Sequence, residues 1–207
     1  MPDSELMQLA IDAASNARTL TAPTPWVGCA IRSADGSTYV GATEPPGQAH
    51  AEIVALNAAG SQAAGAVLAT TLEPCAHTGR TGPCTEAIIE AGVRRVIIGI
   101  EDPDVNVAGA GIAQLRAAGI DVGVGVKADE ITAQLASYLH HRRTGRPYVI
   151  LKLAATVDGR TAAPDGESEW ITGVAARTDV HQMRAESQAI LVGAGTVRAD
   201  DPSLTVR

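Results

Sequence analysis

The sequence contains no phenylalanine, and aromatic residues make up only 2% of its 207 residues. Proteins that bind single-stranded nucleic acids stack the bases on aromatic side chains and hold the backbone in a basic groove. This chain offers few rings and carries a formal net charge of −7. The composition therefore argues against a nucleic-acid partner and favours a small, free molecule as the ligand.

Long apolar runs are also missing. Hydrophobic residues account for 45% of the chain, which is enough for a core, yet no continuous apolar run approaches the ~20 residues of a membrane-spanning helix. The acidic start at Met1-Pro-Asp-Ser-Glu-Leu lacks the basic and apolar regions of a secretory signal. We therefore expect a cytoplasmic protein with no membrane partner.

Cysteine is scarce, with three residues in the chain. Cys29 stands in the apolar run Val27–Ile31, which predicts a buried strand, so we expect a core residue there. The other two cysteines do not suggest a disulfide framework.

Three short segments carry the chemistry: His50-Ala51-Glu52, then Pro74-Cys75, then Pro83-Cys84. This order is typical of zinc-dependent deaminases of nucleobase-like rings. His50, Cys75 and Cys84 would be zinc ligands, which leaves one tetrahedral position open for water. Glu52 would be the catalytic carboxylate that moves the proton of that water.

The local sequence places these groups at helix starts. The small and apolar residues 51–59 predict a buried helix beginning near Ala49, with His50 and Glu52 in its first turn. Pro83 predicts a second helix start, where free backbone N–H groups stabilise a Cys84 thiolate.

Each residue also has a simpler interpretation. His50 alone is more often an ordinary helix histidine, and Cys75 with Cys84 could be a structural pair or a disulfide. A closed structural zinc site would need a fourth ligand, for which His77 is the nearby candidate. The simultaneous presence of Glu52 favours the open, catalytic site.

Helical and strand patterns alternate along the first part of the chain. Helices are predicted at about 4–18, at the two sites above and near 127–141, and strands at about 27–33, 37–41, 66–71, 94–100 and 122–126. We expect a layered α/β domain with a mostly parallel sheet. Polar residues 140–147 mark a boundary between domains at 1–145 and 146–207. In the second, strands are predicted at 148–153 and from Ala189 into the glycines of 193–195.

Two stretches in the first domain and three in the second resemble one family. Residues 71–84, 100–111, 151–162, 166–172 and 195–207 resemble the bifunctional riboflavin-biosynthesis deaminase/reductase. The resemblance implies a cytidine-deaminase-like three-layer α/β/α domain, followed by the start of a dihydrofolate-reductase-like α/β domain. It also implies that a zinc-dependent deaminase acts on a diamino-ribosylaminopyrimidinone 5′-phosphate, and that an NADPH-dependent reductase converts the ribosyl group to ribityl.

The resemblance also assigns residues by motif. In the deaminase it gives His50, Cys75 and Cys84 as ligands, Glu52 as catalytic, and His77, Arg80 and Asp102 as substrate-binding. In the reductase it gives Ala154, Trp170, Thr196 and Asp200 as NADP contacts, and Ser168, Arg184, Leu204 and Arg207 as contacts to the ribosyl phosphate.

Three positions depart from the family pattern. Thr24 stands where asparagine is common, Thr43 where histidine often occurs, and Asp104 where asparagine is usual. These changes are expected to alter substrate orientation more than zinc chemistry. They keep open a deaminase of another base or nucleoside, and a catalytically silent zinc-bearing partner module remains a further alternative.

The reductase resemblance stops at Arg207, short of the length of related domains. We expect an incomplete second domain with an exposed sheet edge and weak or absent reduction by this chain alone. A homo-oligomer is left open.

Overall fold

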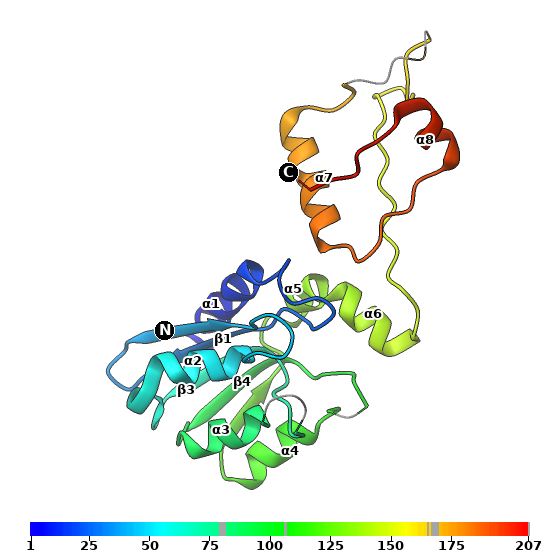
Figure 1. The fold of residues 1–207 in the computed structure, drawn as a ribbon. Coiled ribbons are helices and arrows are strands. Elements are labelled where there is room, and N and C mark those ends of the chain that lie inside the picture. The colour runs from blue at the N-terminus through cyan, green and yellow to red at the C-terminus, as the bar shows by residue number, and fades with distance from the viewer. Residues whose placement is uncertain (79–81, 106, 165, 167–169, 207) are drawn as a thin grey trace. The chain divides into compact units, whose positions relative to one another are not determined.

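A five-stranded sheet organises the first of the chain's two units, which spans Met1–Tyr148 (Figure 1). The computed structural model describes residues 1–207 except 79–81, 106, 165, 167–169 and 207. The strands are β1 (Gly28–Arg32), β2 (Thr38–Ala42), β3 (Val67–Leu72), β4 (Arg95–Ile100) and β5 (Asp121–Val124), in the spatial order β2-β1-β3-β4-β5.

One strand of the sheet, β1, runs opposite to the other four. β3, β4 and β5 run parallel, whereas β1 pairs antiparallel with both β2 and β3. The strands predicted at about 27–33 and 37–41 form the antiparallel β1-β2 hairpin, and so short a connection can join only antiparallel neighbours. Four of the five strands run in one direction, as expected for a mostly parallel sheet, but β1 opposes them, so the sheet is mixed.

Helices cover both faces of this sheet. They are α1 (Asp3–Asn16), α2 (Ala51–Ala59), the short 3-10 helix η1 (Gly60–Ala63), α3 (Cys84–Glu90), α4 (Ala110–Ala117), α5 (Ala128–Gln134) and α6 (Ala136–Thr144). The single helix expected near 127–141 is in fact two, α5 and α6, with Leu135 between them. In the described part of the chain, no helix is both long and apolar enough to cross a membrane.

Glycine contacts identify the layers. Gly28 of β1 lies against the backbone of α1, whereas Gly41 of β2 lies against the backbone of α2. Gly41 is paired with Cys29, so both residues face the same side of the sheet. Cys29 and Gly28 are adjacent in β1 and therefore face opposite sides, so α1 and α2 lie on opposite faces. The expected three-layer α/β/α arrangement is confirmed.

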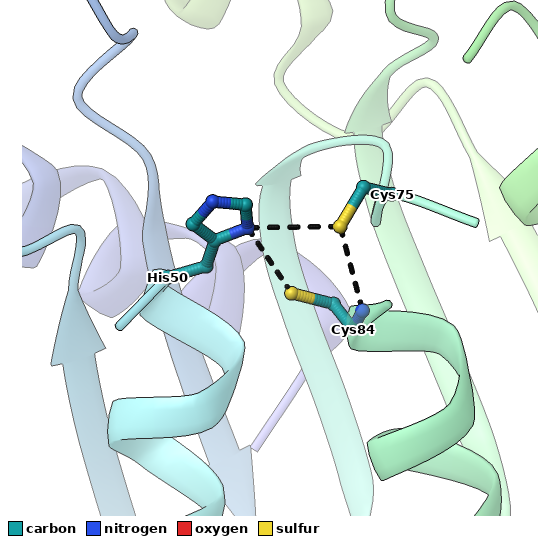
Figure 2. A group of neighbouring side chains, drawn as sticks. All are labelled: His50, Cys75 and Cys84. Atoms are coloured by element: carbon teal, nitrogen blue, oxygen red, sulfur yellow. Dashed lines mark hydrogen bonds between the residues drawn. The ribbon is translucent and has the colours of Figure 1, made fainter. Parts of the chain in front are cut away.

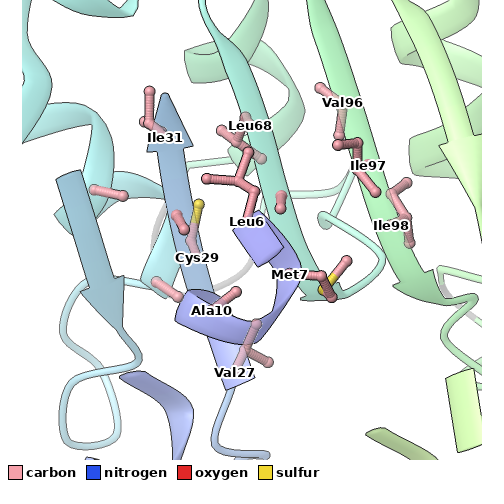
Figure 3. Packing of buried hydrophobic residues seen from close by; sticks show 14 of the residues in the cluster. Leu6, Met7, Ala10, Val27, Cys29, Ile31, Leu68, Val96, Ile97 and Ile98 are labelled. Carbon is pink, nitrogen blue, oxygen red and sulfur yellow. The ribbon is translucent and has the colours of Figure 1, made fainter. Parts of the chain in front are cut away.

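Buried apolar residues form the core on both faces of the central strands, and Figure 3 shows part of this cluster. Leu6 and Met7 of α1 and Ile97 of β4 are fully buried on one face of the sheet, and Ile31 of β1 is fully buried on the other. Alanine fills much of the remaining space, so helices approach the sheet closely without any phenylalanine. Cys29 is fully buried on the face of β1 that α2 covers, as expected for a core residue.

Substituting Gly28 tests this close approach. A Cβ at Gly28 would lie 1.8 Å from the carbonyl oxygen of Ala10 and 2.7 Å from the backbone nitrogen of Ala14. Backbone atoms cannot rotate away, so Gly28→Ala should lower the free energy of unfolding by about 3 kcal/mol or more. Denaturant unfolding measures the loss. Gly123→Ala in β5 is the control, because its Cβ would meet only Arg95 Nη2 at 3.7 Å; equal losses would contradict the prediction.

The second unit, Val149–Arg207, contains α7 (Val174–Glu186) and α8 (Ala194–Asp200). Its described residues form no strand, so the strands expected at 148–153 and 189–195 are not seen as strands. Strands are stable only when they pair with neighbours. The apolar side chains of Leu151 and Leu191 are instead 80% and 98% exposed.

Candidate metal centre

Three side chains from separate elements meet near one end of the sheet (Figure 2). His50 is the N-cap residue of α2, and Cys84 is the first residue of α3. Cys75 follows the end of β3, which directs it toward the start of α3. The two predicted helix starts are thus confirmed, and both bring a side chain to the same point.

The donor atoms of this trio have the spacing of a metal site. His50 Nδ1 lies 3.6 Å from Cys75 Sγ and 3.3 Å from Cys84 Sγ, and all the donor atoms lie within 4.8 Å of one another. Zinc bonds of about 2.3 Å to sulfur and about 2.0 Å to nitrogen, at tetrahedral angles, separate such atoms by roughly 3.5 Å. The residues therefore fit zinc.

All three cysteines of the chain are free, so the disulfide alternative is excluded. His77 is exposed and does not join the group of donor atoms around His50. Among the described residues, the closed site with His77 as fourth ligand is therefore not formed, and three protein donors remain.

The electrostatics of the trio favour a thiolate. Hydrogen bonding to Cys84 lowers the pKa of Cys75 to about 4, with further help from His50. The backbone N–H of Cys84 donates to Cys75 Sγ at 3.4 Å. Hydrogen bonding to Cys75 raises the pKa of His50, and the pKa of Cys84 is raised because it shares its proton with Cys75. The pair thus holds one thiolate before any cation binds.

Glu52 lies in the first turn of α2 and is only 3% exposed. Burial raises the pKa of its carboxyl group, while the helix backbone and the neighbouring His50 oppose that rise. A carboxyl group in such surroundings can hold or release a proton nearer to neutral pH than an exposed glutamate can. It is two residues from His50, which places it beside the donor trio.

Asp102 lies in the loop after β4, and its side chain is bound by protein groups. The hydroxyl of Tyr138 in α6 lies 3.0 Å from both carboxylate oxygens, and the backbone N–H of Asp104 donates to Oδ1 at 2.9 Å. Burial raises the pKa of Asp102. The loop carrying this predicted substrate-binding residue is thus tied to α6.

Two of the three departures from the family pattern have local partners. Asp104 Oδ2 lies 3.2 Å from Nη1 of Arg142, also on α6. The hydroxyl of Thr43 accepts from the backbone N–H of Val27 at 3.2 Å and lies 3.3 Å from its carbonyl oxygen. Thr24 is half-buried and its backbone N–H closes a turn onto Thr21. Thr43 and Asp104 are therefore engaged within the protein scaffold.

A cavity of about 1110 Å³ lies within the second unit. Six of the eight residues predicted to contact NADP or the ribosyl phosphate line it: Ala154, Trp170, Arg184, Thr196, Asp200 and Leu204. Ser168 and Arg207, and Arg80 in the first unit, lie outside the described residues. Segments far apart in the sequence are thus brought together around one space.

Sequence reasoning missed three residues that support the site: Glu73, Tyr138 and Arg142. Tyr138 and Arg142 are one helical turn apart on α6, and this spacing in the sequence indicates that both side chains lie on the same face of the helix. Glu73 directly precedes Pro74-Cys75, where a charged residue follows the fully buried strand β3. Their partners lie too far away in sequence to be inferred from spacing.

Comparison with known families divides the chain in the same order as the sequence motifs. Residues 1–100 match the cytidine and deoxycytidylate deaminase zinc-binding region, and residues 147–207 match the RibD C-terminal domain. The first match contains His50, Cys75 and Cys84, and the second contains the cavity of the second unit.

Individual relatives extend over nearly the whole chain. The riboflavin biosynthesis protein RibD of Mycobacterium tuberculosis is 49% identical over 205 residues, covering 98% of this chain and 60% of the relative. The solved structure of Acinetobacter baumannii RibD (form 1) has a TM-score of 0.91 and 47% identity, over 99% of this chain and 58% of that one.

A second solved structure agrees. The diaminohydroxyphosphoribosylaminopyrimidine deaminase/5-amino-6-(5-phosphoribosylamino)uracil reductase of Thermotoga maritima has a TM-score of 0.91 and 38% identity, over 99% of this chain and 59% of that one. The chain thus spans somewhat more than half the length of the relatives it matches. With both domain types in order and close similarity throughout, the chain belongs to the RibD family of riboflavin biosynthesis proteins.

Proposed function

We propose that this chain catalyses the zinc-dependent hydrolytic deamination of a diamino-ribosylaminopyrimidinone 5′-phosphate. The observation that carries the proposal is the convergence of His50, Cys75 and Cys84 beside the buried carboxyl group of Glu52. Three protein donors leave a position open to water, as a catalytic zinc site requires. The deaminase activity in the printed name of the Thermotoga maritima relative supports the same chemistry.

The proposed mechanism assigns one task to each side chain. His50, Cys75 and Cys84 would hold the zinc ion, which supplies Lewis acidity that activates water when it is bound. Glu52 would accept a proton from that water at a carboxylate oxygen and deliver it to a ring nitrogen. It would then pass a proton to the departing amine, so that water and the amine yield a carbonyl and ammonia.

The substrate would be oriented by groups outside the metal trio. His77, Arg80 and Asp102 are the proposed contacts, and an arginine can bind a phosphate or a ring oxygen through paired hydrogen bonds. Because Asp104 is paired with Arg142 and Thr43 with Val27, these two departures are accommodated without an unpaired buried group. Neither departure needs the substrate as a partner, so both are compatible with the family substrate.

We further propose that residues 1–145 carry the deaminase and residues 146–207 the reductase portion. The cavity of the second unit has the size of a cofactor site, and Ala154, Trp170, Thr196 and Asp200 would hold NADPH, which supplies hydride when bound. Arg184 and Leu204, with Ser168 and Arg207, would contact the ribosyl phosphate.

The described residues of the second unit form no sheet, so we expect little NADPH oxidation by the 207-residue chain. A substrate-dependent loss of NADPH absorbance at a rate comparable to ammonia release would contradict this expectation.

The partner and location proposals follow the chemistry of the substrate. A small phosphorylated pyrimidine is proposed as the ligand, with no nucleic acid or membrane, in the cytoplasm. The acidic composition supports the absence of a nucleic-acid partner, because a net charge of −7 disfavours binding of a polyanion. Whether the chain forms a homo-oligomer can be measured by light scattering of the zinc-loaded protein.

Ammonia release from the diaminopyrimidinone ribotide by zinc-loaded protein tests the proposed reaction. Cytidine, deoxycytidylate and guanine, supplied in parallel, test for another base or nucleoside. We expect release from the ribotide alone. Release from another ring would replace the proposed substrate, and zinc binding without any release would favour the silent partner module.

A further inference from the structure

Glu73 places a carboxylate in the interior, beside the segment that carries Cys75. The residue follows the last position of β3 and is only 4% exposed. Its backbone N–H donates to the carbonyl oxygen of Ile100 at 3.0 Å, which extends the pairing of β3 with β4. A buried carboxylate is costly unless hydrogen bonds compensate for the lost water.

Three backbone N–H groups provide that compensation. Glu73 Oε2 accepts from Asp102 at 3.2 Å and from Gly109 at 3.0 Å, and Oε1 accepts from Ile112 at 3.1 Å. Asp102 and Gly109 lie at opposite ends of the loop after β4, and Ile112 lies in the first turn of α4. One side chain thus closes this loop and satisfies donors at the start of the next helix, which has no capping side chain of its own.

The same junction is packed too closely for larger residues. A Cβ at Gly111 would lie 2.0 Å from the carbonyl oxygen of Pro74 and 3.2 Å from Glu73 Oε1. The first turn of α4 therefore lies directly against the residue that precedes Cys75. Glycine is required at this position because the neighbouring atom belongs to the backbone.

A second connection joins α4 to the Cys75 segment from the other side. The hydroxyl of Thr85 in α3 bonds Gln114 Oε1 in α4 at 2.7 Å, and it lies 3.2 Å from the carbonyl oxygen of Cys75. The backbone N–H of Thr85 donates to that same carbonyl at 3.2 Å. The Cys75 segment is therefore held between α3 and α4.

We propose that Glu73 is a positioning residue that fixes the Asp102 loop relative to the Cys75 segment. By the proposed function, on which this inference rests, the loop would orient the substrate and the segment would bind zinc. Glu73 touches neither substrate nor metal in this scheme. It sets the distance between the two groups through three backbone hydrogen bonds.

The test uses Glu73→Gln in the full chain. The amide keeps the shape of the side chain but places an NH₂ group against at least one backbone N–H, so a hydrogen bond becomes a repulsive contact. We expect KM for the ribotide to rise roughly tenfold, which corresponds to the loss of one charge-assisted hydrogen bond. The change in kcat should be smaller, and the zinc stoichiometry should be unchanged. Amide hydrogen exchange should accelerate at Asp102, Gly109 and Ile112, and remain unchanged in α1.

A stability-matched control separates positioning from general stabilisation. Leu6→Ala removes a fully buried side chain of α1 and should lower Tm without changing KM or the exchange of the three amides. If Glu73→Gln does not fold, Glu73→Asp, which keeps the charge but shortens the reach, replaces it in the same measurements.

The outcomes are decisive in either direction. Wild-type KM in the variant, or exchange that accelerates uniformly across the first unit, would overturn the proposal. If the wild-type protein releases no ammonia, the proposed function fails, and exchange at the three amides still decides whether Glu73 fixes the loop: local acceleration supports the inference and its absence overturns it.

Discussion

Glu52→Gln should retain zinc at the wild-type stoichiometry and release ammonia roughly 10²- to 10⁴-fold more slowly, the range expected for losing a general acid–base group. The amide keeps the volume of the carboxyl group within its buried position in α2. It cannot take a proton from water or return one to the departing amine. Steady-state ammonia release, with metal content determined on the same preparation, measures both quantities.

The control is Glu86→Gln, the same substitution in the first turn of α3 at an exposed residue. It should leave ammonia release unchanged, which separates proton transfer from a general loss of negative charge. A Glu52→Gln protein with a near-normal rate would show that another group moves the proton. A Glu52→Gln protein without zinc would show that the substitution damages the metal site instead.

Cys84→Ser should lower zinc affinity by at least about 10²-fold and remove most of the stabilisation that zinc provides. A serine hydroxyl is a far weaker zinc ligand than a thiolate. The two donors that remain in the variant, His50 and Cys75, cannot hold zinc as tightly as the three donors of the wild-type site. A ligand that binds only the native state raises stability by RT ln(1 + [L]/Kd). Chelator should therefore lower Tm of the wild-type protein and change Tm of the variant very little.

Cys29→Ala provides the matched control for that experiment. Cys29 is fully buried in β1, and burial raises the pKa of its thiol, so it is an apolar packing residue. Its replacement should cost some stability while preserving zinc content and the response to chelator. If Cys84→Ser bound zinc as tightly as the wild-type protein, the assignment of Cys84 as a ligand would be wrong.

The local chemistry of the site could be predicted from the sequence because it depends on short-range features. His50, Pro83 and the apolar run after Ala51 determine where two helices begin, and those starts are where the structure places them. The order of the three motifs then limited the donors to His50, Cys75 and Cys84. Their convergence within 4.8 Å agrees with that limit.

Long-range partners could not be predicted in the same way. The hydrogen bond between Tyr138 and Asp102 spans 36 residues, and so does that between Gly109 and Glu73. No periodicity connects such positions. The pairing of the strands could not be predicted for the same reason, because apolar patterns predict where strands occur but not which strands are neighbours.

The second unit shows a different limit of secondary-structure prediction from the sequence. Residues around Leu151 and Leu191 have the composition of strands, and composition predicts a strand wherever a partner is available. In the described residues that partner is missing, and both side chains are exposed. Six predicted contact residues nevertheless line one cavity, so the placement of motifs was more predictable than secondary structure there.

The contacts of α6 also determine how short a working deaminase can be. Tyr138 and Arg142 hold Asp102 and Asp104 from the far end of the first unit. A shortened version that ends after β5 would contain every proposed zinc donor and Glu52, yet the proposed substrate loop would have lost two anchors. For the proposed deaminase, we therefore expect a minimal catalyst to extend at least through Thr144, although the proposed zinc donors are complete by Cys84.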